Sequence, residues 1–272
     1  MRGVTPAFTV LFALCCGVGA YPQQKKVATK IPPRAVTYSQ VEFTGSIPPG
    51  YLGHDGKAIY KQLLRRRSEL QKGEFETASA FQERVKADSG KPLYGSLTQY
   101  SLLAFVFAPA NGDTSTGFTV QYDPDKQVLQ AKLETWPTHT MSLNNDVALL
   151  WGVLDRSVEH YRASNAYGAI VTVERVFTEY VALSFAKQSS LRPFTFEVYV
   201  PPEKARALKG NVRILVTGRL SDPPLQDGFF KVPATISSPY EMLKAYHYLH
   251  LILGDVYLLD ISNGEILKVW RE

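Results

Sequence analysis

Histidine spacing gives the most direct suggestion of chemistry in this sequence. The chain has five histidines, His54, His139, His160, His247 and His250, and only the last two are close together. On a helix, positions i and i+3 share a face, so His247 and His250 could bind one metal ion. On a strand, the odd spacing places them on opposite faces and excludes chelation. Metal binding by this pair therefore depends on the local secondary structure.

The segment that carries the pair is compatible with both structures. Ser238-Pro239-Tyr240-Glu241 fits a capping box with proline at the first helical position. Residues 246–253 are equally suited to a strand, and a hairpin motif around Ser262-Asn263-Gly264 follows directly. We predict a strand from about Ala245. This favours partly buried structural histidines over a metal site.

Other motifs do not assign a reaction. Asp123 and Asp125 flank a proline, which favours a turn over a calcium loop with six or more oxygens. The sequence contains no G-x-S-x-G, P-loop or H-E-x-x-H motif. We therefore assign no catalytic, cofactor-binding or metal-binding residue and no cofactor. Separated histidine, aspartate and serine residues could still meet as a triad, which keeps a hydrolase as the main alternative.

Residues 1–20 have the pattern of a signal peptide. Arg2 forms a short positive region, Val4–Leu14 is an apolar run too short to span a membrane, and Val18-Gly19-Ala20 is a cleavage site. Both cysteines of the chain, Cys15 and Cys16, fall inside this segment. Cleavage after Ala20 would leave no cysteine, which excludes thiol catalysis, zinc-thiolate sites and iron–sulfur sites.

A lipoprotein is the alternative route of export, with a lipid anchor at Cys15 or Cys16. Leu14 is bulkier than the small residue that usually precedes such a cysteine. No later stretch is apolar enough to span a membrane. We predict a periplasmic or secreted protein, with a membrane-anchored lipoprotein as the alternative.

The charge of the chain does not indicate nucleic-acid binding. The formal net charge is +5, and a nucleic-acid footprint requires basic residues clustered on one face. The only dense cluster, Arg65-Arg66-Arg67, is interpreted as a solvated helical face. Aromatic residues are dense near the C-terminus, and packing across strands is favoured there over sugar binding. They are Tyr240, Tyr246, Tyr248, Tyr257 and Trp270.

The stretch from Tyr167 to Phe196 predicts the middle of a β-sheet. Apolar side chains recur at every second residue, which places them on one face. Arg175 and Glu179 interrupt that face, so we predict a bend or hairpin turn near residues 175–180. If the protein has an activity, we expect it at the edges of this sheet.

Two helices are predicted before the sheet. Residues 57–71 have an apolar stripe with helical spacing, and Thr77 is a good N-cap for a second helix ending near Ala87. Residues 21–55, rich in proline and glycine, predict an extended leader. Residues 147–161 predict a short helix or an irregular crossing.

The segment Lys72-Gly73-Glu74-Phe75-Glu76-Thr77, followed by Phe81 and Arg84, resembles a helix start of exported bacterial envelope proteins of unknown function. The run Asn165-Ala166-Tyr167-Gly168 is similar to a run in the same proteins. This resemblance implies a bacterial cell-envelope location. It implies no activity or catalytic residue.

Together these patterns predict an α+β fold with an N-terminal helical hairpin packed on a mostly antiparallel β-sheet or sheet pair. The expected organisation is residues 1–20 as signal peptide, 21–55 as leader and 56–272 as one domain, with a possible subdivision near 137–165. The expected function is non-catalytic binding or a structural role, with an envelope protein or cell-wall component as partner.

Overall fold

The computed structural model describes residues 46–109, 117–138, 147–164, 167–185 and 192–271. The predicted signal peptide with Cys15 and Cys16, most of the predicted leader and His139 lie outside these residues. The helices are α1 (Gly56–Glu69), α2 (Ala78–Ser89) and α3 (Pro202–Leu208). The strands are β1 (Leu103–Phe107), β2 (Phe118–Asp123), β3 (Val128–Leu133), β4 (Trp136–Pro137), β5 (Val147–Ser164), β6 (Ile170–Phe185), β7 (Phe194–Tyr199), β8 (Val212–Val232), β9 (Tyr240–Asp260) and β10 (Glu265–Trp270).

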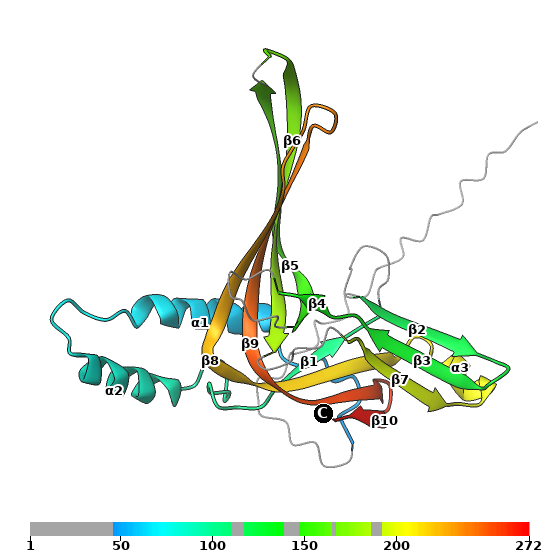
Figure 1. Cartoon of the computed structure of the whole chain (residues 1–272). Helices are drawn as coiled ribbons and strands as arrows, with labels where there is room; N and C mark the ends of the chain where they lie inside the picture. Colours follow the sequence, from blue (N-terminus) through cyan, green and yellow to red (C-terminus); the bar gives the residue numbers. More distant parts are fainter. Residues whose placement is uncertain (1–45, 110–116, 139–146, 165–166, 186–191, 272) are drawn as a thin grey trace, which may run out of the picture. The chain divides into compact units, whose positions relative to one another are not determined.

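The strands form a seven-stranded sheet and a three-stranded sheet (Figure 1). The larger sheet has the order β1-β8-β9-β6-β5-β4, with β10 also paired to β9. It is mixed, because β6 and β9 run parallel while its other pairings are antiparallel. The smaller sheet has the order β2-β3-β7. Residues distant in sequence therefore meet along β6 and β9.

Of the predicted bend or hairpin turn near residues 175–180, the hairpin turn is wrong. Strand β6 runs without a turn from Ile170 to Phe185, between β5 and β9. Arg175 forms an ion pair with Glu241 of β9, and the Glu179 carboxylate lies 3.8 Å from the imidazole of His247, also on β9. Arg175 and Glu179 thus interrupt the apolar pattern because they contact polar side chains of a neighbouring strand, and β6 continues beyond both residues.

The main core lies on one face of the larger sheet, which we call the helix face because α1 packs against it. Val181, Leu183 and Phe185 of β6 contribute apolar side chains to this core. Ile59 and Leu63 of α1 are buried in the same cluster. The apolar stripe of α1, which follows the helical repeat of 3.6 residues, therefore packs on apolar side chains that recur at every second residue of the strands.

The predicted α+β class is wrong, since the described residues are mostly β, with 54% in strands and 16% in helices. The two N-terminal helices do not form a hairpin packed on the sheet. Helix α2 buries only Ser89, and Phe81 and Val85 are only partly buried. Its apolar stripe is too narrow to cover a sheet face. The Thr77 N-cap is confirmed, because its hydroxyl accepts a hydrogen bond from Ala80 N at 3.2 Å.

Long strands account for much of the difference. Residues 147–161 lie in β5, where we predicted a helix or an irregular crossing. The turn motifs at Pro223-Pro224 and Asp227-Gly228 lie inside β8. There the pairing with β9 shifts between Leu220 and Leu225, so a bulge absorbs the two prolines. The predicted strand at the histidine pair is confirmed and begins at Tyr240.

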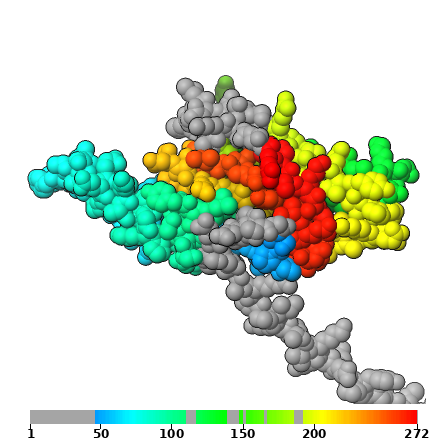
Figure 2. Space-filling model, turned by 90° about the horizontal axis from the view of Figure 1, so that it is seen from below, coloured from blue at the N-terminus to red at the C-terminus, as the bar shows by residue number. Residues whose placement is uncertain are grey.

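Residues 47–50 are bound to the β9–β10 hairpin, and His54 is bound to β1 through a hydrogen bond to Ala104 O. Ile47 N donates to Gly264 O at 3.1 Å, and Gly50 N donates to Ile261 O at 2.7 Å. Gly264 has a φ of 79°, and a Cβ there would collide with the carbonyl of Ile47. Figure 2 shows this blue segment beside the red C-terminal strand. The last residues of the predicted leader are thus packed on the domain.

We expect Asp55→Ala to lower the free energy of unfolding by about 0.5–2 kcal/mol. The Asp55 carboxylate accepts hydrogen bonds from Lys57 N at 2.9 Å and Ala58 N at 3.3 Å, at the start of α1. Alanine leaves both donors without this partner. Urea unfolding measures the loss. Asp55→Asn is the control, because it keeps an acceptor at the N-cap; an equal loss in both variants would contradict this explanation.

Candidate functional site

Four strands continue beyond the main core as an extension that we call the arm. It comprises residues 153–164 of β5, 170–180 of β6, 225–232 of β8 and 240–247 of β9, with the connection 233–239. Figure 1 shows these strands running side by side. Both hairpin ends lie at the same end of the arm, because Glu174 pairs with Tyr240 in parallel register.

Within the described residues, α1 contacts the arm at Asp227 and His247, and the arm exposes apolar side chains on both of its faces. On the helix face, Phe229 is 55% exposed. On the opposite face, Val158 and Ile170 are 49% and 59% exposed. Further exposed apolar residues of the arm and its connections are Val153, Tyr167, Phe230, Val232, Ile236 and Tyr240. Such a concentration of exposed apolar surface is typical of an interaction site.

A buried carboxylate joins the strands of the arm. The side chain of Glu241 is 4% exposed. Its oxygens accept from Arg175 Nε at 2.6 Å, Lys231 Nζ at 2.7 Å and the Tyr161 hydroxyl at 3.0 Å. The guanidinium carbon of Arg175 also lies 4.5 Å from the centroid of the Tyr161 ring. These contacts connect β5, β6, β8 and β9 through one side chain.

The ionisation of this cluster argues against acid–base catalysis. Hydrogen bonds from Lys231 and Arg175 lower the pKa of Glu241 to about 2. The hydrogen bond to Glu241 raises the pKa of Arg175. A general acid or base works best with a pKa near the working pH. We interpret the cluster as a structural link between strands.

We expect Glu241→Gln to lower the melting temperature at pH 7 by several degrees, because it removes the charge that pairs with Arg175 and Lys231. The lowered pKa means that the wild-type contribution is present above the ordinary value of 4.5 and is lost as pH falls toward about 2. The variant should therefore lose less stability across that interval.

Thermal melts at a series of pH values test this expectation. Glu159→Gln is the matched control, because the Glu159 side chain is 66% exposed and lies 3.7 Å from Arg175. An exposed pair of this kind contributes little. Equal acid sensitivity of the wild type and Glu241→Gln would contradict the role assigned to Glu241.

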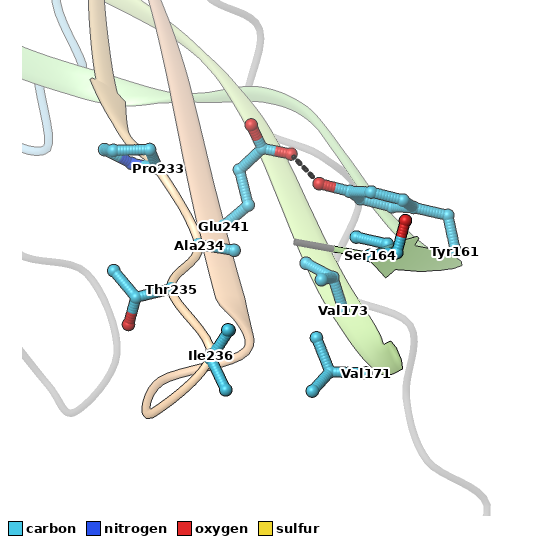
Figure 3. A pocket seen from close by; sticks show the side chains of 10 residues that line it. Tyr161, Ser164, Val171, Val173, Pro233, Ala234, Thr235, Ile236 and Glu241 are labelled. Carbon is cyan, nitrogen blue, oxygen red and sulfur yellow. Dashed lines mark hydrogen bonds between the residues drawn. The ribbon is translucent and has the colours of Figure 1, made fainter. Parts of the chain in front are cut away.

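A pocket of about 340 Å³ lies beside this cluster, at the end of the arm. It is lined by Tyr161, Ala163, Ser164, Val171, Val173, Pro233, Ala234, Thr235, Ile236 and Glu241. Figure 3 shows Val171, Val173 and Ile236 below the bond between Tyr161 and Glu241. The pocket thus combines an apolar floor with hydroxyl groups and an ion-paired carboxylate. Pockets of this size with few polar groups suit an apolar group of a ligand.

The two neighbouring histidines point to different faces of β9. His247 lies on the helix face, where Nδ1 is 2.9 Å from Asp227 Oδ1 and its ring stacks on Tyr60 at 5.0 Å. His250 lies on the opposite face, where Nδ1 is 3.0 Å from Ser184 Oγ. The two rings cannot chelate one ion. Within the described ranges, no group of three or more potential ligands could hold a metal.

These histidines also do not form a hydrolase triad in the described residues. The described contacts of His247 are with the carboxylates of Asp227 and Glu179 and with the ring of Tyr60, and none of them is with a serine hydroxyl. His250 and Ser184 are 6% and 0% exposed, so a substrate cannot reach them without rearrangement. The pocket of the arm contains no histidine. Neither His247 nor His250 therefore belongs to a serine–histidine–carboxylate triad that a substrate could reach in this structure.

The other sequence motifs have structural partners. Asp123 Oδ1 accepts from Asp125 N and Lys126 N, both at 3.1 Å, as expected of a turn. Arg66 is only 12% exposed and donates to the carbonyls of Lys91 and Pro92. The arginine cluster is therefore partly a tether between α1 and the chain before β1, and not wholly a solvated face.

The C-terminal aromatic residues pack against neighbouring rings. Tyr246 stacks on Tyr180 at 5.4 Å and on Tyr248 at 6.0 Å. Burial raises the pKa of Tyr246 to about 12. Trp270 makes an edge contact with Phe194 at 5.0 Å. The contacts of Tyr246, Tyr248 and Trp270 agree with the predicted packing, whereas Tyr240 is 41% exposed on the arm.

Sequence reasoning missed the residues that shape the pocket. Arg175 interrupts an apolar strand face in the sequence, but nothing in the sequence connects it with Glu241 or Tyr161. A charged side chain on a half-buried strand face costs free energy unless it is paired. The position of Arg175 therefore predicts a partner of opposite charge. The parallel pairing of β6 with β9 supplies that partner.

Comparison of the chain with protein-family models, with curated proteins and with solved structures finds no match. The resemblance around Lys72–Thr77 therefore stays a prediction. None of the helices that the structure describes has the length and apolar character needed to cross a membrane. The functional assignment depends on the geometry of the arm and its pocket.

Proposed function

We propose that this chain is an exported, non-catalytic binding protein of the cell envelope that contacts a partner protein through the arm. The observation that carries this proposal is the exposed apolar surface on both faces of the arm. Its export and its envelope location rest on the signal-peptide pattern of residues 1–20. A lipid anchor at Cys15 or Cys16 is the alternative attachment.

The pocket beside Glu241 supports a contact with a protein side chain. Its floor of Val171, Val173 and Ile236 suits an aliphatic or aromatic group. Arg175 and Lys231 bring two positive charges to Glu241, while Glu159 lies 3.7 Å from Arg175. The polar groups around the pocket are mostly engaged with one another. Burial of apolar area would therefore supply most of the affinity.

Chemical crosslinking in intact cells that produce the protein, followed by affinity purification, tests this function. We expect one envelope protein to be recovered reproducibly with the wild-type chain. Recovery of cell-wall material without protein would redirect the proposal to a polymer ligand. Recovery of no partner, together with turnover in a screen of hydrolase substrates, would overturn the proposal in favour of an enzyme.

A further inference from the structure

One edge of the arm is open to strand pairing. Residues 225–232 of β8 pair with β9 on one side. Across the described residues, their other side has no paired strand, because β1 pairs only with residues 214–218 of β8. Pro224 and Pro233 flank the open segment, and proline cannot donate to a ladder. The segment therefore offers a strand edge of defined length.

The two outer strands of the arm differ in their protection against pairing. The outer part of β5 is rich in charges that commonly block edge-to-edge association: Asp155, Arg156, Glu159 and Arg162. The open segment of β8 has only Asp227 and Lys231 as charged residues. It also exposes Phe229 and Val232, which are 55% and 37% exposed. The β8 edge is thus the less protected of the two.

We propose that this β8 edge pairs in antiparallel register with the same edge of a second copy, with the two-fold axis at Phe229. In this register Asp227 of each copy lies directly opposite Lys231 of the other. Opposite charges across an antiparallel pair stabilise it. Asp227 already contacts Arg67 and His247, and Lys231 contacts Glu241. The side chains of Asp227 and Lys231 nevertheless remain 51% and 50% exposed, so each can make a further ionic contact.

The other positions of the register are also compatible with pairing. Gly228 lies opposite Phe230, so an aromatic side chain covers the surface that glycine leaves open. The two Phe229 side chains meet at the axis as an aromatic cross-strand pair. A shift of the axis to Gly228 or to Phe230 removes the pairing of opposite charges. The charges therefore select the register centred on Phe229.

Disulfide trapping tests the register because only a residue at the axis lies opposite itself. Directly opposite Cα atoms in antiparallel strands are about 4.5–5.5 Å apart, within the range for a disulfide. In a full-length background with Cys15→Ser and Cys16→Ser, Phe229→Cys should give a disulfide-linked dimer under mild oxidation. Val232→Cys is the control, because residue 232 lies opposite Gln226 and far from its own copy.

Analytical ultracentrifugation of the purified chain tests the association without a crosslink. We expect a reversible monomer–dimer equilibrium in the Cys15→Ser, Cys16→Ser background. Asp227→Lys in that background should shift it toward monomer, because two lysines then face each other, with circular dichroism confirming that the variant is folded. The proposal would be overturned if the background protein is a monomer at all concentrations and Phe229→Cys forms no disulfide-linked dimer.

Two further outcomes would also overturn it. Equal trapping by Phe229→Cys and Val232→Cys would show association without the proposed register. Binding of an extended peptide from another protein at this edge, with the chain itself monomeric, would replace the second copy as occupant. These measurements use the purified chain alone. Their failure is therefore distinguishable from a failure to find an envelope partner.

Discussion

Phe185→Ala is expected to lower the free energy of unfolding by about 3–5 kcal/mol, the usual cost of truncating a buried phenylalanine. Phe185 is 0% exposed and belongs to the main core at the end of β6. Its removal leaves a cavity where β5, β6 and β9 meet. Urea or guanidinium unfolding followed by circular dichroism measures the loss.

Phe75→Ala is the matched control for this experiment. Phe75 is 94% exposed and precedes α2, so its truncation should change the free energy of unfolding by less than about 0.5 kcal/mol. A similar loss in both variants would mean that the main core is not the source of stability. The contrast between them therefore tests the position of the core directly.

Ile236→Asp is expected to reduce recovery of the envelope partner tenfold or more while leaving the melting temperature unchanged. Ile236 is 49% exposed and lines the arm pocket, so a charge there is tolerated in the free protein. In a complex, the carboxylate would be buried against an apolar group without a partner, which costs binding energy. Quantitative crosslinking and affinity purification from cells measures recovery.

Ile252→Asp is the control for the binding prediction. Ile252 is 58% exposed and lies on β9 outside the arm. The two variants introduce the same charge at exposed isoleucines, so a difference in recovery reports position. Equal loss of recovery in both variants, or no loss with Ile236→Asp, would contradict the assignment of binding to the pocket.

Local patterns in the sequence predicted several elements of the fold. The turn at Asp123, the N-cap at Thr77 and the hairpin around Gly264 depend on short-range hydrogen bonds and backbone conformation, which nearby residues determine. The strand at His247 and His250 was predicted because a hairpin motif follows directly in the sequence. It also correctly predicted that the two imidazoles lie on opposite faces.

The fold class failed because it depends on pairings between distant residues. Pro223-Pro224 has the local character of a turn, yet the pairing of β8 with β9 carries the strand across it through a bulge. Residues 147–161 form a strand because they pair with β6 along their length. Helix α2 has the expected ends but too little apolar surface to pack on the sheet.

The candidate site was beyond sequence reasoning for the same reason. Tyr161, Arg175, Lys231 and Glu241 lie on four strands and meet only through the parallel pairing of β6 with β9. The expectation that any activity would lie at the edges of this sheet stays a prediction. The arm presents both its edges and its end, and the pocket forms at the end.

Site-specific photo-crosslinking tests most directly whether the arm is the binding element. A photo-crosslinking amino acid replaces one of two exposed aromatic residues. Tyr167 is 96% exposed and lies at the end of the arm, between β5 and β6. Phe75 is 94% exposed and lies between α1 and α2, outside the strands of the arm. After irradiation of intact cells, we predict a discrete adduct with one envelope protein from position 167 and none from position 75. An adduct from position 75 alone, or equal adducts from both positions, would contradict the account.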